Sequence, residues 1–593
     1  MSFNPTWIGR VESVIGNTVA VRLDNNYPSN MPVVQGVVYR IGQVGSFLKI
    51  PLGFANLFGI VTQAGASAIP EALILQRQGL SALEESNQWL QMVLVGEQVG
   101  RRFERGVLQS PATGDQVHLV TNEDLRLVYG GYEEQSSIVI GNLSASESLS
   151  ARLDLDRLVT RHSAVLGATG SGKSNAVSVI VGSIAQKALP SARVLIIDPH
   201  GEYAEALQGR CCVLRIGSTA NTVTERPLDI PYWALPFKEL MSLFPGSLTD
   251  SNEDYVRGKV VELKRKWAAD KKDVKIEAVS ADSPIPFSVH QLWFELDDCE
   301  RMTLHSDRCT PCSVLTSGNA AQLLSNIYPA ANPGGKEPFI NMKAKGILSF
   351  LDAMRNRLLD ARYRFLFEPG DYTPDLNGAS KADLNELLTT WFGHGQPVTI
   401  LDLSEVPTDI RQSVSGSILK IIYDALYWGQ MTSVGGKQQP LLIVLDEAHS
   451  YLRAGEDSIS SRTVQAIAKE GRKYGVGLML VTQRPSELDE TVLSQCGTIV
   501  ALRMTNSKDK AQVTSAVQDE LKEMSDILSS LRTGEALISG EAVRIPSRMR
   551  FYHYSHAVKG ADPRPSEQWL LPLPNVEEYG TSVRNWRNQT FKT

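Results

Sequence analysis

The 593-residue sequence has little cysteine, no convincing membrane span and no excess of basic residues. Its six cysteines are too few and too unevenly spaced for a disulfide framework, which favours a reducing compartment, and we expect the cytoplasm. The most apolar stretch, residues 50–70, is uncharged, but Pro51, Asn56, Thr62 and Gln63 interrupt it. We therefore expect no membrane-spanning helix. The N-terminus also lacks the basic and then apolar pattern of a signal peptide.

The charge balance argues against a protein that coats nucleic acid. The formal net charge is −6 and the isoelectric point is near 6.0. A ring that contacts DNA only in its channel remains compatible with this charge, because symmetry multiplies a few basic residues per subunit. The basic cluster of residues 264–266 with Lys271, Lys272 and Lys275 has acidic neighbours, and we interpret it as a solvated helix face.

A phosphate-binding loop lies in the first third of the chain. Residues 163–174 read Ser-Ala-Val-Leu-Gly-Ala-Thr-Gly-Ser-Gly-Lys-Ser, a short apolar strand that runs into Gly-x-x-x-x-Gly-Lys-Ser. The glycines permit turns that a Cβ would block, so that backbone N–H groups converge on phosphate oxygens at the start of the next helix. Lys173 then reaches the β- and γ-phosphates of ATP, and the Ser174 hydroxyl binds Mg²⁺. The residues predicted to hold the nucleotide are Gly167, Ala168, Thr169, Gly170, Ser171, Gly172, Lys173, Ser174 and Asn175.

A second motif predicts how water is activated. Leu441–Leu445 is a continuous apolar run, as in a strand buried on both faces of a parallel sheet, and Asp446 and Glu447 follow it. Asp446 is placed to hold the Mg²⁺ shell, and Glu447 to polarise the attacking water as a general base.

Two further strands end in polar residues. Residues 194–197 lead into Asp198-Pro-His-Gly-Glu-Tyr, and residues 477–481 lead into Thr-Gln-Arg-Pro. Open α/β sheets bind ligands at the carboxyl ends of their strands. We therefore expect Asp198 to support the metal, Glu202 to support the metal or the water, and Gln483 to sense the γ-phosphate or orient water.

These segments resemble the HerA ATPases, which belong to the HerA/FtsK group of hexameric DNA-translocating motors. The resemblance rests on Gly-Ala-Thr-Gly-Ser-Gly-Lys-Ser, Asp-Pro-His-Gly-Glu-Tyr, Leu-Asp-Glu-Ala-His, Glu-Gly-Arg-Lys-Tyr-Gly and Thr-Gln-Arg-Pro-Ser. It covers most of the chain, because the N-terminal part also looks like the family's β-barrel. It implies a homo-hexameric ring that threads or pumps double-stranded DNA, usually beside a nuclease or another effector protein.

Two arginines are candidates for coupling subunits. Arg161 lies shortly before the phosphate-binding loop, and Arg472 lies in a segment that the family shares. A guanidinium is a permanently charged donor suited to the charge that builds on transferring phosphoryl oxygens. If the ring places either residue in the neighbour's site, hydrolysis depends on assembly; a surface or salt-bridging role is equally open.

The predicted fold class is α/β: a RecA-like P-loop ATPase core with an inserted helical subdomain and a small N-terminal β-barrel. Residues 1–130 contain short β-branched runs split by Gly, Asn and Pro, and residues 142–158 are expected to connect them to the core. The predicted divisions are a barrel at 1–130, a core at 142–235 and 389–550, an insertion at 236–388 and a C-terminal extension at 551–593. Helical spacing in the insertion is expected at 255–267, 319–327, 345–367 and 382–391.

One cysteine cluster leaves a metal site open. Cys299, His305, Cys309 and Cys312 are able to supply four ligands to a tetrahedral zinc ion. However, they contain only one Cys-x-x-Cys pair, and its partners are irregularly placed.

Together the motifs and the resemblance predict a hexameric, Mg²⁺-dependent ATPase that moves on double-stranded DNA. Its partner would be a nuclease or another effector, in DNA end processing or antiphage defence. Two alternatives stay open: an ATP-binding hexameric scaffold that regulates a nuclease or an NAD-consuming effector, and a secretion-type ATPase with the same core motifs.

Overall fold

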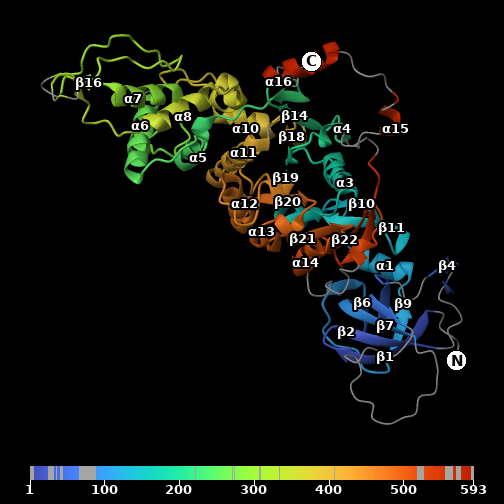
Figure 1. Ribbon diagram of the computed structural model, residues 1–593. Helices are drawn as coiled ribbons and strands as arrows, with labels where there is room; N and C mark the ends of the chain where they lie inside the picture. Colours follow the sequence, from blue (N-terminus) through green and yellow to red (C-terminus); the bar gives the residue numbers. More distant parts are fainter. Residues whose placement is uncertain are drawn as a thin grey trace.

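The molecule consists of a β-barrel, a large mixed sheet with its helices, and a helical insertion, which follow one another in space (Figure 1). The computed structural model describes residues 6–24, 32–34, 36–39, 44–65, 88–218, 220, 222–269, 271–272, 274–305, 309–332, 334, 336–406, 408–516, 527–554, 565–568, 570 and 576–588. Among the helices of these residues, none is long and apolar enough to cross a membrane.

The N-terminal strands close into a small barrel, as their short β-branched runs split by Gly, Asn and Pro predicted. The strands are β1 (Trp7–Ile15), β2 (Thr18–Leu23), β5 (Phe47–Pro51), β6 (Ala55–Gly65), β7 (Trp89–Val99), β8 (Arg102–Arg105) and β9 (Gln116–Leu119). Their order is β2-β1-β9-β5-β6-β7-β8, and a further pairing of β2 with β7 closes the ring. Ile8, Val19, Leu57 and Met92 are fully buried in its interior.

Two details refine the barrel expected at 1–130. Among the described residues, β3 (Val33–Val34) and β4 (Val37–Val38) pair with each other. The region ends in a helix, α1 (Asn122–Tyr129). A capping box between Thr121 and Asp124 fixes its start.

A sheet of twelve strands forms the core, in the order β11-β10-β23-β22-β21-β12-β20-β19-β13-β18-β14-β15. Its strands are β10 (Ser137–Leu143), β11 (Ser146–Asp154), β12 (Ser163–Leu166), β13 (Val194–Asp198), β14 (Cys211–Arg215), β15 (Glu225–Pro227), β18 (Val398–Asp402), β19 (Leu441–Leu445), β20 (Val476–Thr482), β21 (Thr498–Leu502), β22 (Glu535–Gly540) and β23 (Ser547–Phe551). The strands from β21 to β15 are parallel, and those from β22 to β11 are antiparallel. The parallel part is the RecA-like α/β core that the sequence predicted.

The antiparallel part corrects one expectation and refines another. Residues 142–158, expected to be a connection, contain β11 and the end of β10, a hairpin that pairs with β23 and so extends the sheet. The predicted boundary of the core at residue 550 falls within β23, which lies inside the same sheet. Unlike the buried parallel strands, β11 has no continuous apolar run, so that signal did not reveal it.

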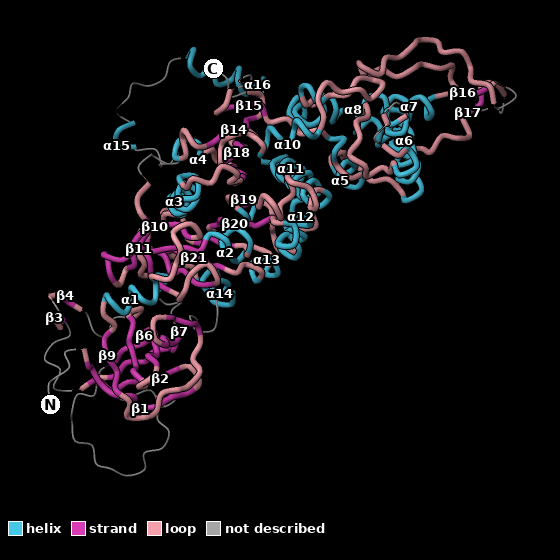
Figure 2. The backbone as a smooth tube through the Cα atoms, turned by 180° about the vertical axis from the view of Figure 1, so that it is seen from behind, coloured by secondary structure: helices cyan, strands magenta, loops and turns pink. Residues whose placement is uncertain are grey.

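Helices cover the sheet and fill the insertion. Those of the core are α2 (Leu155–Thr160), α3 (Lys173–Gln186), α4 (Tyr203–Ala206), α11 (Thr408–Trp428), α12 (Ile459–Glu470), α13 (Glu490–Ser494) and α14 (Ser507–Ala516); α15 (Pro565–Gln568) and α16 (Val576–Asn588) follow in the C-terminal extension. The insertion contains α5 (Phe237–Ser242), α6 (Asp250–Ala268), α7 (Val289–Arg301), α8 (Leu348–Leu359), α9 (Arg364–Phe367) and α10 (Leu384–Phe392), with the short strands β16 (Thr303–Leu304) and β17 (Phe339–Ile340). Figure 2 shows this insertion projecting from the core on the side away from the barrel.

Three of the four expected helical stretches of the insertion contain helices, and one does not. The stretch 319–327 is a closed turn, in which Thr316 bridges Ile327 and Asn319 bridges Leu324. The Asn326 side chain accepts a hydrogen bond from Gly318 N at 2.6 Å, which closes the turn. Side chains of Asn compete with helical hydrogen bonds in this way, so apolar spacing alone gave the wrong answer.

Lys264 corrects the interpretation of the basic cluster as a solvated face. Its side chain is buried, and its ammonium donates to the carbonyls of Ala281 at 2.7 Å and Ser283 at 2.5 Å. Burial lowers the pKa of Lys264 to about 7. Lys266, two positions further on the same helix, is more than half exposed, as expected.

Candidate nucleotide-binding and hydrolysis site

The loop between β12 and α3 has the backbone that its glycines predicted. Gly170 has a φ of 71° and Gly172 a φ of 101°, a region that residues with a Cβ avoid. Gly172 is also the N-cap of α3, and a Cβ there would lie 3.0 Å from Gly534 N. The first N–H groups of α3 have no acceptor within the helix, so they are available to phosphate oxygens.

Neighbouring strands hold this loop in place through the backbone. Gly167 N donates to Thr482 O at 3.3 Å, and Ala168 N donates to Arg503 O at 2.9 Å. Gly534 N, just before β22, donates to Ser171 O at 2.9 Å. No sequence motif indicates this role of Gly534, because a backbone contact between distant segments depends on tertiary structure.

The side chains of the loop divide into two sets. Lys173 Nζ donates to Ala168 O at 3.2 Å, Ser174 Oγ donates to Glu202 Oε2 at 2.6 Å, and Thr169 Oγ1 donates to Gln483 Oε1. These contacts bring Glu202 and Gln483 to the loop, as the strand ends predicted. Asn175 instead faces the segment that follows β23: its side chain donates to Tyr552 O and accepts from Tyr554 N, both at 2.9 Å.

Asp446 and Glu447 follow β19 at the same edge of the sheet. The side chain of Asp446 is buried, and Glu447 has a φ of 49°, a left-handed conformation that is strained for a residue with a Cβ. His449 Nδ1 lies 3.2 Å from Glu447 Oε2 and 3.0 Å from Thr482 Oγ1. His449 therefore lies beside the carboxylate that was predicted to act as the base. The motif contained this histidine, but its spacing alone assigned it no role.

Asp198 uses its carboxylate to order the loop that carries Glu202. Oδ1 accepts from His200 N at 3.1 Å and from Gly201 N at 2.8 Å, while Oδ2 accepts from Tyr203 N at 3.1 Å. The predicted role of Asp198 as a metal ligand stays a prediction.

The site carries an excess of negative charge around one lysine. Burial raises the pKa of Asp446 well above its usual range, and the nearby Asp198, Glu447 and Glu202 raise it further. Burial lowers the pKa of Lys173, against the opposing effect of Glu447, Asp446 and Glu202. For Glu447, burial raises the pKa, but His449, Lys173 and His200 outweigh it, so that the net pKa is below the usual value.

These donors fit a magnesium ion. The Ser174 hydroxyl and the carboxylates of Glu202 and Asp446 are hard oxygen ligands, which Mg²⁺ prefers. A divalent cation would also offset the burial and the clustered carboxylate charge that together raise the pKa of Asp446.

The two arginines lie at the amino ends of the parallel strands, opposite the carboxyl ends that carry the phosphate-binding loop. Arg161 precedes β12 and forms an ion pair with Glu541, with Nε 3.4 Å from Oε2. Arg472 precedes β20 in a short 3-10 helix (η7, Gly471–Tyr474), and its side chain is exposed. Since β12 and β20 are parallel neighbours whose carboxyl ends face the phosphate-binding loop, both arginines are on the edge away from their own chain's loop.

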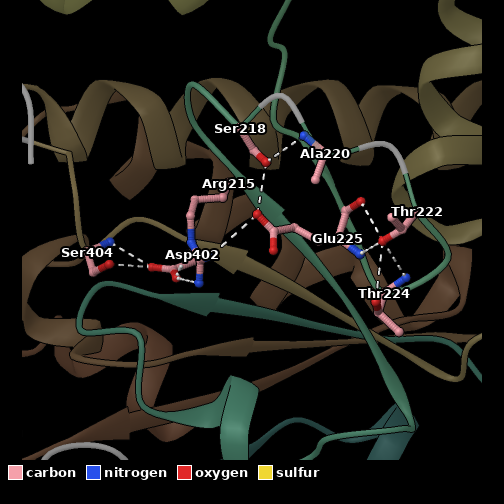
Figure 3. Close-up of polar contacts among 8 residues, drawn as sticks. All are labelled: Arg215, Ser218, Ala220, Thr222, Thr224, Glu225, Asp402 and Ser404. Carbon is pink, nitrogen blue, oxygen red and sulfur yellow. Dashed lines mark hydrogen bonds and ion pairs between the residues drawn. The ribbon is translucent and has the colours of Figure 1, made fainter. Parts of the chain in front are cut away.

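A polar network next to the site was not predicted from the sequence (Figure 3). Asp402 ends β18 opposite Asp198 in the parallel register. Arg215 donates from Nε and Nη2 to Asp402 Oδ2, at 2.9 and 2.8 Å. The other oxygen accepts from the backbone N–H and hydroxyl of Ser404, at 3.0 and 2.6 Å. The network fixes the strand edge beside the loop that carries Glu202.

The fold and this edge define a P-loop nucleoside triphosphatase with a RecA-like sheet. The family model for the HerA helicase central domain matches residues 138–422, and that for the HerA-like helicase C-terminal domain matches residues 377–546. The chain belongs to the HerA family, and it is an ATP-hydrolysing enzyme.

The chain is also similar to individual helicases over most of its length. It is 26% identical over 473 residues to the DNA double-strand break repair helicase HerA of Pyrococcus furiosus, covering 74% of this chain and 73% of the relative. It is 26% identical over 485 residues to the protein of the same name from Sulfurisphaera tokodaii, covering 80% of each. Among solved structures, VirB4 of Thermoanaerobacter pseudethanolicus is 16% identical with a TM-score of 0.45, covering 71% of this chain and 98% of VirB4.

Replacing Arg215 with Met should destabilise the core, because it leaves the buried Asp402 carboxylate without its cation. We expect the free energy of unfolding to fall by about 2 kcal/mol. This is less than the loss from breaking a fully buried ion pair, because Arg215 is partly exposed to solvent. The double variant Arg215→Met with Asp402→Asn removes the charge but keeps an oxygen for Ser404, so it should recover much of this loss. Thermal unfolding of the three proteins measures both effects; equal losses in the single and double variants would show that Arg215 does not act by compensating Asp402.

Proposed function

We propose that this protein is a Mg²⁺-dependent ATPase that assembles into a homo-hexameric ring and moves along double-stranded DNA. The observation that carries the proposal is the separation of two sets of residues across the parallel sheet. Lys173, Asp446 and Glu447 gather at the carboxyl edge, while Arg161 and Arg472 lie at the opposite edge. Each subunit therefore has its phosphate site at one end of the parallel strands and its candidate charge-stabilising arginines at the opposite end.

Each residue of the carboxyl edge has a distinct task in hydrolysis. Lys173, which contacts Ala168 O at 3.2 Å, exchanges this carbonyl for phosphate oxygens when the nucleotide binds. Glu447, whose lowered pKa keeps it ionised, polarises the attacking water, and His449 holds it in position. Gln483 contacts Thr169 of the loop, so its amide is placed to respond to the γ-phosphate. Magnesium, held by Ser174 and Asp446, would neutralise charge on the phosphates.

In the proposed ring, the neighbouring subunit supplies the arginine that stabilises the phosphoryl charge. Head-to-tail packing of identical chains brings one edge of a subunit against a different edge of its neighbour, and a closed rotation gives a ring. Packing the amino edge of one sheet against the carboxyl edge of the next places Arg161 or Arg472 near the neighbour's phosphates. Hydrolysis would then require assembly, which is suited to a motor whose subunits act in sequence.

DNA and an effector protein are the proposed partners. The relatives from Pyrococcus and Sulfurisphaera are named as DNA double-strand break repair helicases, which supports DNA as the track. A nuclease or other effector acting beside the ring, in DNA end processing or antiphage defence in the cytoplasm, completes the proposal.

Removing the base should separate ATP binding from hydrolysis. Glu447→Gln should bind ATP with near-normal affinity but turn it over roughly 10²–10³-fold more slowly, because the amide does not accept a proton. Lys173→Ala should lose both binding and turnover. Equilibrium binding of a fluorescent ATP analogue and steady-state phosphate release measure the two steps; near-normal turnover by Glu447→Gln would assign the base to another residue, with Glu202 the first to examine.

A DNA track should stimulate the ATPase. We expect linear double-stranded DNA to raise the turnover of the full chain several-fold and Lys173→Ala to show no response. Phosphate release with and without DNA, over a range of salt concentrations, measures this effect, since phosphate contacts weaken with salt. Unchanged turnover at saturating DNA would contradict translocation and favour the ATP-binding scaffold.

Mixed rings should reveal whether an arginine acts across the interface. If Arg161 or Arg472 serves the neighbouring site, the Arg→Ala chain mixed with the Lys173→Ala chain should regain activity at interfaces that combine both intact residues. Co-assembly is verified by affinity capture of one differently tagged chain with the other. If neither mixture gains activity after co-assembly, neither arginine acts at the neighbouring subunit's site.

A further inference from the structure

The outer end of the insertion brings together side chains that ATP hydrolysis does not use. Figures 1 and 2 place β16 at this end, far from the phosphate-binding loop. His305, Cys312 and Glu337 meet there, with their ligand atoms all within 4.8 Å of one another. Of the four residues that the sequence grouped, the structure brings only His305 and Cys312 together, and it adds Glu337, which is distant in sequence.

Backbone pairing fixes this arrangement. Thr303 and Leu304 of β16 pair with β17 on one side, and Leu304 forms a bridge with Pro311 on the other. Cys312 N donates to Thr303 O at 2.8 Å. Three chain segments therefore run side by side, and His305 directly follows β16 while Glu337 lies just before β17.

The three side chains form a cluster with one buried and two accessible potential ligands. Cys312 is buried, and its thiol makes no hydrogen bond to any residue that the structure describes. His305 Nδ1 contacts a carboxylate oxygen of Glu337, and both side chains remain partly exposed. A buried sulfur with an imidazole and a carboxylate above it leaves one side open to solvent.

Polar contacts, more than apolar ones, hold the surrounding segment. Between β16 and α8, β17 is the only helix or strand among the described residues. Leu323 is buried, but Leu315, Ile340 and Met342 are exposed. Asp298 of α7 accepts hydrogen bonds from Asn326 and Tyr328, both at 2.7 Å, which anchors the middle of the segment. Small structural units with little buried apolar surface commonly rely on a metal or disulfide for stability.

We propose that His305, Cys312 and Glu337 bind one zinc ion that fastens the outer end of the insertion, with water as the fourth ligand. Thiolate, imidazole and carboxylate together fit zinc, whereas magnesium and calcium prefer oxygen alone. Binding forms one bond each to sulfur, nitrogen and oxygen and releases the thiol proton of Cys312 to solvent. Cys299 lies outside this group, with its sulfur near Asn341 Nδ2 at 3.5 Å.

The test is the zinc content of the full chain, purified without a histidine tag from zinc-containing medium and then dialysed. Elemental analysis should find about one zinc per chain in the wild type. Cys312→Ser should lower the zinc content roughly tenfold or more. Mutating a residue that only hydrogen-bonds to a metal ligand already lowers metal affinity about tenfold or more, and Cys312 is itself a proposed ligand. Cys299→Ser is the matched control and should keep the wild-type content.

A second measurement separates ligand loss from misfolding. Cobalt added to the metal-free wild-type chain should give a thiolate-to-cobalt charge-transfer band, and Cys312→Ser should lack the band while still hydrolysing ATP. Wild-type protein with no zinc and no cobalt band would overturn the proposal, as would a Cys312→Ser variant that retains full zinc. Neither result depends on the proposed movement along DNA.

Discussion

The parallel backbone pairing of β12, β13, β19 and β20 is the constraint on which the site depends. It aligns Leu166 with Thr482 and Ile197 with Leu445, so the residues that follow these strands emerge at one edge. The chain between β13 and β19 holds the whole insertion, yet the ladder of hydrogen bonds brings its two ends back together. Without this register, Lys173 and Glu447 would share no site.

The same alignment concentrates charge at that edge. Asp198 and Asp402 end neighbouring strands, and each is satisfied differently: Asp198 by three backbone N–H groups, Asp402 by Arg215 and Ser404. Asp446 has no such arginine among the contacts described, and burial, followed by the neighbouring carboxylates, raises its pKa. The edge is therefore built to receive a cation together with its anionic nucleotide.

Local motifs were predictable, and tertiary contacts were not. The phosphate-binding loop, the pair Asp446 and Glu447, and the buried strands before them were correctly placed in the sheet, because glycine geometry and apolar runs act over a few residues. The bond from Gly534 to Ser171 and the ion pair of Arg215 with Asp402 join residues far apart in sequence, so no spacing rule reveals them. Lys264 shows the same limit, since only the packing of α6 decides which member of a basic run is buried. The helix predicted at 319–327 was wrong because the side chain of Asn326 bonds to the backbone and stabilises a turn despite the apolar spacing.

The central claim is that one chain holds the phosphate-binding and water-activating groups while its neighbour supplies the arginine. The most direct measurement is an electron cryomicroscopy structure of the assembled protein with Mg²⁺ and a non-hydrolysable ATP analogue. The account predicts the γ-phosphate between Lys173 and Gln483, with Glu447 facing it and Arg161 or Arg472 of the adjacent subunit within hydrogen-bonding distance. A γ-phosphate contacted only by residues of its own chain would contradict it.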